Sequence, residues 1–451
     1  MDLRCPVKIS TRSAGLILAI LFVACCDAPW SGPPDWNQAF PQDRIGEWKI
    51  SVSEENWLRL IADPHSLPCT GEGRGPDCSA DAECPLGCDC VDGLCVTDYI
   101  EAELEVDGQK FSQVGLSITG DRRAEKENFR IRFDLFRPEQ RYFDLGRVNL
   151  RSGRQDPTLI REKLALELFR SAGVCAPRAA FAWVIVNEEP RGLYTLVQQV
   201  DRKLLEDCFG EDWGNLYRLR PGADLAWQGE DLTAWWPPFS AVYQKVTNEG
   251  SSDVSDLLSL MKILSGEVEP ELEKALYLDE FLRAQAVNSW LSNLDSYAGT
   301  GDNLYLYHDA AGRFRYIPWD LSKAFGNYHG LACSFSTDEM LALSPFSPTC
   351  GDARPLIDRT LEVESYKKRY QDIIGKLLLE VLDPQRVFSR AVFWHAFVRE
   401  RAYADRRKGF SDAEFEETLY RDIPANDNPA RVPGLEKFVF FRDNVFRNLI
   451  E

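Results

Sequence analysis

The chain has 451 residues, of which 44% are hydrophobic and 12% aromatic, enough to bury a large core. Its formal net charge of −19 repels the phosphate backbone of nucleic acids and argues against a basic patch that binds membranes. The composition therefore favours a globular protein that binds no nucleic acid.

Residues 1–25 have the pattern of an export signal. Three basic residues, Arg4, Lys8 and Arg12, precede an apolar run from Ala14 to Ala24 that is too short to span a bilayer. The run ends in FVACC, where a small residue before Cys25 is similar to the lipobox of bacterial lipoproteins, although the usual leucine stands one place early. We expect export to the bacterial cell envelope, with membrane attachment only through lipid on Cys25; plain secretion is the alternative.

The next segments alternate between linker, strand and helix. Residues 26–43 are rich in Pro, Trp and Asp and are typical of a tether. The stretch WKISVSEENWLRLIADP predicts a strand followed by a short helix with a serine cap. YIEAELEVDGQKF predicts a hairpin that turns at Asp107-Gly108, and NFRIRFDLF predicts a further strand.

A cysteine-rich insertion over residues 66–98 interrupts this pattern. Six cysteines lie in a Gly- and Asp-rich run: Cys69, Cys78, Cys84, Cys88, Cys90 and Cys95. An even number of cysteines in an exported chain favours disulfides whose connectivity the sequence leaves open, and a zinc site without a nearby His is the weaker alternative. We also expect Cys333 and Cys350 to close a second loop, while Cys175 and Cys208 are available to pair with each other.

The remainder of the chain shifts from strands to helices. Asp156-Pro157 predicts the start of a helix that ends at Gly173, and FAWVIVNEEPRGLYTLVQQVD predicts two strands around a turn at Glu-Glu-Pro-Arg-Gly. A helix is predicted from Leu276 to Leu294, followed by the hairpin LYLYHD–RFRYIPWDL and a mostly helical C-terminal part. The order predicts an α+β fold over residues 44–450, with a β-rich N-terminal half, a helical C-terminal half and two lobes.

Two acidic residues flank the predicted hairpin. Asp295 precedes the first strand in a polar loop, and Asp320 follows the second strand. The outer ends of a hairpin lie together, so Asp295, Asn303 and Asp320 can face one site. Phosphoryl transfer uses such a set, in which one acid accepts the hydroxyl proton while a second acid and an Asn hold the metal. Acids at hairpin ends are also common structural caps.

The stretch NLDSYAGTGDNLYLYHDAAGRFRYIPWDLSKAFG resembles the CotH family, which is named for a spore-coat protein H kinase. The resemblance extends through DPTLIREKLALELFRSAGVCAPR, NEEPRGLYTLVQQVD, AVYQKV and RPLIDRTL, from Ile45 to about Tyr370. It implies an atypical, bilobal protein-kinase-like fold and use of ATP with Mg²⁺ or Mn²⁺. It also implies that Asp295 is the catalytic acid and that Asp320 binds metal. Asn303 would take part in both catalysis and metal binding, although it lies further along the sequence from Asp295 than the corresponding Asn in protein kinases.

The same resemblance suggests residues that contact the nucleotide. The family's basic strand is similar to AEKENFRIRF, so Lys126, Arg130 and Arg132 are candidates to bind phosphate, with a solvated strand face as the alternative. Lys245 is a further candidate, although it also fits an ordinary exposed lysine. The family usually has a Glu near Gln198, and a Gln binds Lys or Mg²⁺ less strongly. Glu162 or Glu167 can substitute for it, although each also fits a surface charge.

The combined pattern predicts an exported protein kinase that phosphorylates Ser or Thr hydroxyls of a protein substrate. The alternative is a catalytically weak pseudokinase that binds a cell-surface partner through the cysteine-rich loop. Gln198 and the scarcity of ATP outside the cytoplasm favour this second interpretation.

Overall fold

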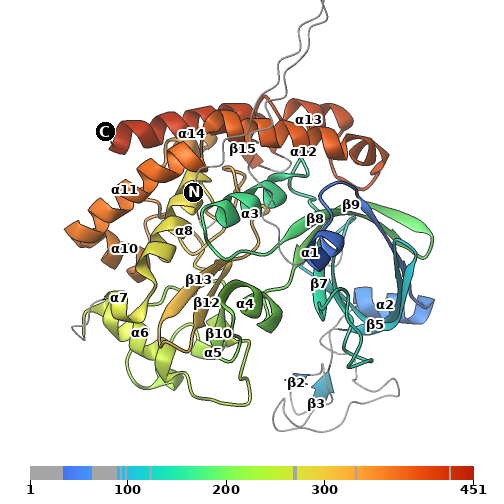
Figure 1. Ribbon diagram of the computed structural model, residues 1–451, viewed down its shortest axis with the longest axis horizontal. Coiled ribbons are helices and arrows are strands. Elements are labelled where there is room, and N and C mark those ends of the chain that lie inside the picture. The colour runs from blue at the N-terminus through green and yellow to red at the C-terminus, as the bar shows by residue number, and fades with distance from the viewer. Residues whose placement is uncertain are drawn as a thin grey trace, which may run out of the picture.

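The computed structural model describes residues 34–62, 89–91, 94–96, 99–120, 124–267, 272–330, 333–425 and 428–450. Cys25, the four cysteines from Cys69 to Cys88, and the charged residues 121–123 lie outside these ranges. Two hydrophobic cores organise the described part, one inside a β-barrel and one among helices and a second sheet. The chain thus has the predicted mixed α+β character (Figure 1).

A closed barrel of seven strands forms the first core, on the right in Figure 1. Its order is β1-β4-β5-β6-β7-β9-β8, and it closes where β1 pairs with β8 in parallel. The strands are β1 (Gly46–Ser51), β4 (Ile100–Val106), β5 (Gln109–Thr119), β6 (Asn128–Arg132), β7 (Arg147–Arg151), β8 (Ala179–Val186) and β9 (Glu189–Gln198). The helices α1 (Pro34–Ala39) and α2 (Glu54–Ala62) contribute apolar side chains to its core.

Local turn chemistry accounts for the hairpins of the barrel. Asp107 and Gly108 both have positive φ, as a tight hairpin turn requires, and Val106 pairs with Gln109 across it. The predicted hairpin is therefore confirmed. Between β8 and β9 the turn lies at Asn187 and Glu188, which have φ of 48° and 66°, and not at the predicted Glu-Glu-Pro-Arg-Gly. Pro190 instead lies within β9 and pairs with Ile185.

A four-stranded sheet in the order β11-β10-β12-β13 contains the predicted second hairpin. Its strands are β10 (Asn215–Leu219), β11 (Tyr243–Lys245), β12 (Leu304–His308) and β13 (Phe314–Pro318). The surrounding helices begin with α3 (Arg161–Ser171), α4 (Arg202–Phe209), the 3-10 turn at Leu232–Ala234, α5 (Phe239–Val242), α6 (Ser255–Ser265), α7 (Leu272–Ala275) and α8 (Leu278–Trp290). The helix α8 packs on β13, which fixes the segment between α8 and the hairpin.

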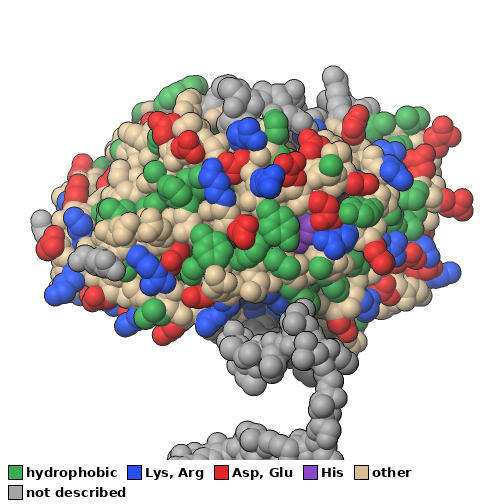
Figure 2. Space-filling model, turned by 90° about the horizontal axis from the view of Figure 1, so that it is seen from above, with side chains coloured by type: hydrophobic (Ala, Val, Ile, Leu, Met, Phe, Trp, Pro, Cys, Tyr) green, Lys and Arg blue, Asp and Glu red, His purple; other side chains and the backbone are tan. Residues whose placement is uncertain are grey.

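The C-terminal part is helical, as predicted. It contains α9 (Thr337–Ala342), α10 (Pro355–Glu362), α11 (Glu364–Glu380), α12 (Pro384–Ala404), α13 (Asp412–Glu417) and α14 (Leu435–Ile450), with a small unpredicted hairpin of β14 (Ile423–Ala425) and β15 (Asn428–Val432). From above, this face mixes charges of both signs with hydrophobic side chains (Figure 2). Exposed phenylalanines on α12 and α14 are Phe393, Phe440 and Phe441.

Two predicted boundaries differ from the structure. The second half of the predicted tether is ordered, since Trp36 and Phe40 are buried against the barrel and Arg178 stacks over Trp36. The helix predicted to start at Asp156-Pro157 begins later, at Arg161. Asp156 still acts as a cap, because its carboxylate accepts hydrogen bonds from the backbone N–H groups of Thr158 and Arg161. The residues between Asp156 and Arg161 form turns and not helix.

The disulfide predictions outside the insertion agree with the structure. Cys333–Cys350 and Cys175–Cys208 form disulfides with Cα–Cα distances of 5.4 and 5.8 Å. Within the insertion, β2 (Asp89–Val91) and β3 (Leu94–Val96) form a two-stranded ladder in which Cys90 and Cys95 are partners. Within the described residues, no helix has the length and apolar character needed to cross a bilayer.

Candidate active site

The β12–β13 hairpin brings Asp295, Asn303 and Asp320 together. The ladder pairs Leu304 with Pro318, and the backbone N–H of Trp319 donates to the carbonyl of Asn303 at 3.0 Å. Asn303 in turn donates from Nδ2 to the backbone carbonyl of Asp295 at 2.9 Å. The residues before and after the hairpin are therefore held in one place, as the sequence predicts.

The backbone is unusual at both ends of this hairpin. Asn303 has φ of 54° and Asp320 has φ of 46°, both in the left-handed region. Asn and Asp are the non-glycine residues that adopt this region most readily, although it still costs free energy. The surrounding packing therefore imposes these conformations, and they direct the two side chains out of the regular strand pattern.

Asp320 lies among charged groups from the barrel and from α3. Arg151, the last residue of β7, donates to Oδ2 of Asp320, and Ser322 donates to Oδ1 at 2.7 Å. Burial acts to raise the pKa of Asp320, but Arg151 and Ser322 reverse this effect and hold it below the ordinary value. Asp320 is therefore ionised at neutral pH.

Glu162, in the first turn of α3, joins the same group. Its carboxylate lies 3.7 Å from Nε of Arg151, and its charged form is also favoured by the backbone N–H of Leu321. Burial nevertheless raises the pKa of Glu162 to about 7, and the charge of Asp320 adds to this effect. Glu162 is thus not the surface charge that the sequence also allowed. Glu167 lies elsewhere, bound to Lys163 and Arg390.

Asp295 is the most perturbed acid of the polar loop. Its Oδ2 lies 3.2 Å from Nζ of Lys323. Burial, together with the charges of Asp320 and Asp302, raises the pKa of Asp295 to about 6 in spite of Lys323. Asp302 accepts a hydrogen bond from Thr300, and burial raises the pKa of Asp302 as well. Asp295, Asp302 and Asp320 thus lie close enough together to influence one another's ionisation.

The site has an excess of negative charge that suits a cation. Four acids, Glu162, Asp295, Asp302 and Asp320, face two basic residues, Arg151 and Lys323. Carboxylate and amide oxygens are the ligands that Mg²⁺ prefers, usually one or two carboxylates together with phosphate and water oxygens. Across the described ranges, no three His, Cys, Asp or Glu side chains are disposed to enclose a metal ion. The donors therefore fit a metal ion shared with a phosphate, but not a site built from protein alone.

The segment after the hairpin holds the loop of Asp295 in position. Arg354 is buried and donates to the backbone carbonyls of Tyr297, at 2.6 Å, and Gly299. Ser292 donates to the carbonyl of Met340 in α9 at 2.7 Å. Leu294 packs with Tyr328, Cys333 and Met340 in a small core beside the Cys333–Cys350 disulfide. The loop is thus held by the segment that this disulfide closes, through Met340, and by Arg354 just beyond that segment.

Lys126, a candidate for phosphate binding, has a different environment. Its Nζ is buried and donates to Asp405 at 2.7 Å and to the carbonyl of Leu193 at 2.6 Å. Burial lowers the pKa of Lys126, although Asp405 opposes the effect. Gly192 permits this contact, because a Cβ there would overlap Asp405. The structure thus places Lys126 in an ion pair that joins the barrel to the end of α12.

The other nucleotide candidates are dispersed. Arg130 and Arg132 alternate with core residues Phe129 and Ile131, so they share the outer face of the barrel. Arg132 donates to Asp134 at 3.0 Å, whereas Arg130 lies opposite Asn149 on β7, the strand that carries Arg151.

Gln198 and Lys245 form contacts of their own outside the acidic group. Gln198 is buried and accepts from Arg178 at 3.1 Å. Lys245 donates to the carbonyls of Ser251 and Asp253.

Arg151, Lys323 and Asp302 are the site residues that the sequence analysis missed. Lys323 and Asp302 lie inside the motif that identified the hairpin, close to Asp320 and Asn303, so their charge was a usable signal. Arg151 had no such signal, because the short segment RVNLR was not predicted as a strand. Its position depends on the pairing of β7 with β6 and β9.

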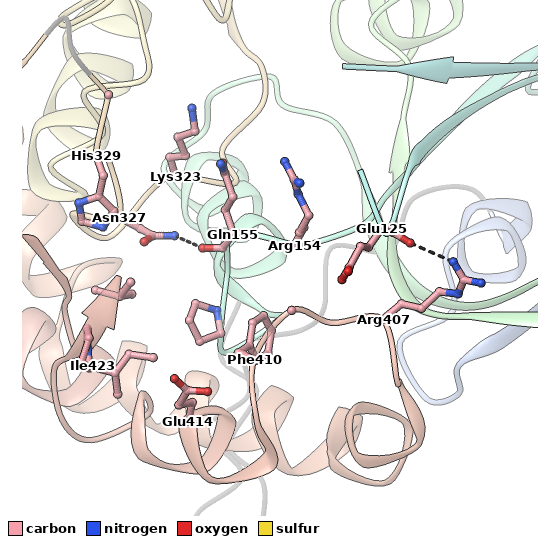
Figure 3. Close-up of a pocket in the computed structure, with 15 residues that line it drawn as sticks. Glu125, Arg154, Gln155, Lys323, Asn327, His329, Arg407, Phe410, Glu414 and Ile423 are labelled. Carbon is pink, nitrogen blue, oxygen red and sulfur yellow. Dashed lines mark hydrogen bonds between the residues drawn. The ribbon is translucent and has the colours of Figure 1, made fainter. Parts of the chain in front are cut away.

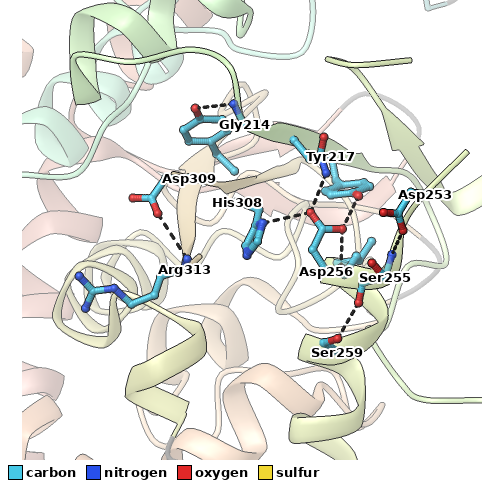
Figure 4. Close-up of polar contacts among 12 residues, drawn as sticks. Gly214, Tyr217, Asp253, Ser255, Asp256, Ser259, His308, Asp309 and Arg313 are labelled. Atoms are coloured by element: carbon cyan, nitrogen blue, oxygen red, sulfur yellow. Dashed lines mark hydrogen bonds and ion pairs between the residues drawn. The ribbon is translucent and has the colours of Figure 1, made fainter. Parts of the chain in front are cut away.

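The opposite end of the hairpin holds a separate polar cluster (Figure 4). His308, the last residue of β12, lies with Nδ1 3.2 Å from Oδ2 of Asp256, and Tyr217 donates to Asp256 at 2.6 Å. Burial opposes ionisation of Asp256, but His308 and Tyr217 lower its pKa to about 2. The cluster therefore joins α6 to the sheet at the turn end of the hairpin.

Comparisons with known proteins bear on the family to which this chain belongs. Residues 111–424 match the family model described as CotH kinase protein. The chain is 24% identical over 300 residues to inner spore coat protein H of Bacillus subtilis, a match that covers 64% of this chain and 78% of that protein. It is 23% identical over 265 residues to spore coat protein homolog 1 of Rhizopus delemar, covering 57% of this chain but only 42% of that protein.

A solved structure from the HipA–HipB toxin–antitoxin system of Shewanella oneidensis, in complex with operator DNA, is 13% identical. The match covers 84% of this chain and 75% of that chain, and its TM-score is 0.22, which is too low to bear on the fold. The assignment rests on the family model, whose match spans most of the chain and includes the hairpin with Asp295, Asn303 and Asp320. This protein therefore belongs to the CotH kinase family.

Proposed function

We propose that the protein is an exported, ATP-dependent protein kinase that transfers the γ-phosphoryl group to Ser or Thr hydroxyls of a protein substrate. The observation that carries this proposal is the convergence of Asp295 and Asp320 at the two ends of the β12–β13 hairpin. Membership of the CotH kinase family supports it. The separate barrel and helical cores support a bilobal, kinase-like body, in which the nucleotide binds between the two lobes.

Asp295 has the properties of the residue that accepts the hydroxyl proton. A general base works best when its pKa lies near the operating pH, because it is then ionised and still has affinity for a proton. Burial and two neighbouring acids raise the pKa of Asp295 to about 6. Lys323 keeps the carboxylate oriented through its contact with Oδ2.

Asp320 and Asn303 are the proposed residues for Mg²⁺ or Mn²⁺. The Nδ2 of Asn303 is engaged with the carbonyl of Asp295, which leaves Oδ1, an oxygen ligand of the type these ions take. Each oxygen of Asp320 accepts one hydrogen bond and has a second lone pair, so either oxygen could also bind a metal ion. When bound, the metal would supply positive charge against the phosphates.

Arg151 and Glu162 are assigned to the nucleotide side of the site. Protein kinases place a Lys on a strand and a Glu on the following helix as an ion pair, next to the metal-binding Asp. Here Arg151 ends the strand before α3, Glu162 lies in the first turn of α3, and Arg151 also contacts Asp320. We assign to Arg151 the phosphate contact that the sequence analysis gave to Lys126, while Arg130 on the neighbouring strand can assist.

A second function is favoured by the same contacts. Arg151 forms an ion pair with Asp320, and Lys323 forms one with Asp295, so both proposed catalytic acids already have a cationic partner within the protein. This arrangement also fits a pseudokinase whose cysteine-rich insertion binds a surface partner. In that case the protein would not bind ATP, and deletion of residues 69–95 would abolish partner binding.

Phosphate transfer from labelled ATP to casein tests the proposal. The purified protein with Mg²⁺ or Mn²⁺ should label casein, and Asp295→Asn and Asp320→Asn should each reduce the rate by several orders of magnitude. Asp372→Asn, at an exposed position on α11, is the matched control and should leave the rate unchanged. No labelling together with no thermal shift from ATP would support the pseudokinase, because a bound nucleotide must raise the melting temperature.

A further inference from the structure

A pocket of about 600 Å³ lies beside the candidate active site. It is formed by the loop after β7, the segment after β13, the segment after α12 and the β14–β15 hairpin (Figure 3). Its volume is in the range of pockets that hold a drug-sized ligand or several side chains of a peptide. Neither the sequence motifs nor the roles given to the acidic residues account for it.

Lys323 connects this pocket to Asp295. It lines the pocket, and its Nζ lies 3.2 Å from Oδ2 of Asp295. The lining, as far as the described residues define it, includes neither Arg151 nor Asp320. Asp295 is not among these lining residues either, and the pocket is linked to it through the ion pair with Lys323.

Apolar side chains contribute to one wall of the pocket. Phe410 and Ile423 lie on the side opposite Lys323 and Arg154 in Figure 3, with Glu414 between them, and the same lining includes Pro157, Pro424 and Val432. Phe410 is partly exposed even though it is a large hydrophobic side chain. An apolar wall in such a pocket is suited to bury an apolar side chain of a substrate.

The charges at the rim are partly engaged within the protein. Arg407 donates to the carbonyl of Glu125 at 3.0 Å and lies 3.3 Å from Glu189. Glu414 accepts hydrogen bonds from the backbone and side chain of Ser411. With cations and acids both present and engaged, the rim gives little preference for one sign of charge. The apolar wall is left as the main source of selectivity.

We infer that this pocket receives the acceptor segment of the substrate, and that it selects a Ser or Thr next to a bulky apolar residue. This inference rests on the proposed kinase function. In the reaction, the acceptor oxygen forms a bond to the γ-phosphorus while the bond from that phosphorus to the β,γ-bridging oxygen breaks. The electron pair of the broken bond leaves on ADP, and the hydroxyl proton passes to Asp295.

Two short peptides test the inference, one with a serine followed by leucine and the other with glutamine in place of leucine. The wild type should have a KM for the leucine peptide about tenfold lower, which is the size expected for burying a few carbons in an apolar pocket. Phe410→Ala should remove this difference and leave the KM for ATP unchanged. Phe441→Ala, which removes a partly exposed phenylalanine from α14 outside the pocket, should keep the difference.

A second variant tests the pocket independently of whether Phe410→Ala folds. Arg154 is exposed, so Arg154→Trp can fill the mouth of the pocket without disturbing the core, and it should also raise the KM for the leucine peptide. An increase in the KM for ATP in either variant, with peptide selectivity intact, would assign the pocket to the nucleotide and overturn the inference. Equal KM values for both peptides in the wild type would overturn it as well.

Peptide binding separates this inference from the proposed kinase activity. The labelled leucine peptide should bind the wild type and bind Phe410→Ala about tenfold more weakly in fluorescence anisotropy, whether or not phosphate is transferred. Binding with this dependence but without transfer would refute the kinase proposal and keep the pocket as a peptide site. Binding that Phe410→Ala does not change would refute the pocket assignment, even in an active kinase.

Discussion

Arg151, at the end of β7, donates to the carboxylate of Asp320, the residue two positions beyond β13. The contact joins the barrel to the sheet that carries the catalytic candidates. Glu162 approaches the same guanidinium from α3, so strand, helix and hairpin meet at one cation. A change in the position of the barrel relative to the helices would therefore change the environment of Asp320.

Removal of this cation should affect both stability and nucleotide use. Arg151→Gln leaves Asp320 and Glu162 largely buried without their common partner, and we expect a loss of about 2 kcal/mol in the free energy of unfolding. The kcat/KM for ATP should fall about 100-fold or more. Urea denaturation and steady-state kinetics measure the two effects. Arg147→Gln on the same face of β7 is the control, and an unchanged kcat/KM for ATP in Arg151→Gln would contradict the assignment.

The rate should depend on pH through Asp295. A proton acceptor must be ionised, and burial raises the pKa of Asp295 to about 6, so kcat/KM should decline as the pH falls below about 6. The charge of Asp302 contributes to this raised pKa. Asp302→Asn should therefore move the acidic limb to lower pH. A pH–rate profile with a peptide lacking ionisable side chains measures this, and a limb that does not move would show that another group controls it.

Glu162 should make the metal-free protein less stable as the pH rises. Its pKa is raised to about 7 in the fold, above the ordinary value of 4.5, so the folded state favours the protonated form. The stability this provides is complete below about pH 4.5 and is lost as the pH rises through about 7. Relative to Glu162→Gln, which mimics the protonated acid, the wild type should lose up to about 3 kcal/mol between pH 4.5 and 8. Denaturation in EDTA measures the gap, and a constant gap would exclude this titration.

The two disulfides should differ in their effect on activity. Replacing Cys333 and Cys350 by serine, or Cys175 and Cys208 by serine, should cost about 3 kcal/mol in either case, because both close loops of moderate length. Only the first pair closes the segment in which Met340 accepts from Ser292, next to the loop of Asp295.

We therefore expect a several-fold lower kcat for the Cys333/Cys350 variant at a temperature where both variants are folded, with the KM for ATP unchanged. Kinetics on both variants under oxidising conditions tests this. Equal kcat values for the two variants would show that the segment does not position Asp295.

Lys126 should prove structural and not nucleotide-binding. Lys126→Met leaves Asp405 buried without its cation, which should cost about 3 kcal/mol, while the KM for ATP should not change. The double variant Lys126→Met/Asp405→Leu removes both charges and should recover part of the loss. Thermal unfolding and ATP kinetics measure these effects. A higher KM for ATP with little loss of stability would restore Lys126 as a phosphate ligand.

Local patterns predicted the elements that depend on neighbouring residues. The Asp107-Gly108 turn, the helix α8 and the β12–β13 hairpin are set by turn chemistry and by short-range hydrophobic periodicity. The hairpin pattern also predicted that Asp295, Asn303 and Asp320 lie close together, because the two outer ends of a hairpin are adjacent. The turn after β8 was misplaced, since Asn187 and Glu188 adopt positive φ without a glycine.

The sequence by itself therefore determined the CotH motifs, the hairpin and the acids at its ends. Only the tertiary structure decided which cations meet those acids: Arg151 reaches Asp320 because β7 lies between β6 and β9 in a closed barrel, while Lys126 is drawn into a buried pair with Asp405. The physical reason is the separation along the chain over which each kind of interaction acts. Turns and periodicity act over a few residues, whereas the partner of a buried charge is chosen by how distant segments pack and by the cost of leaving that charge unpaired.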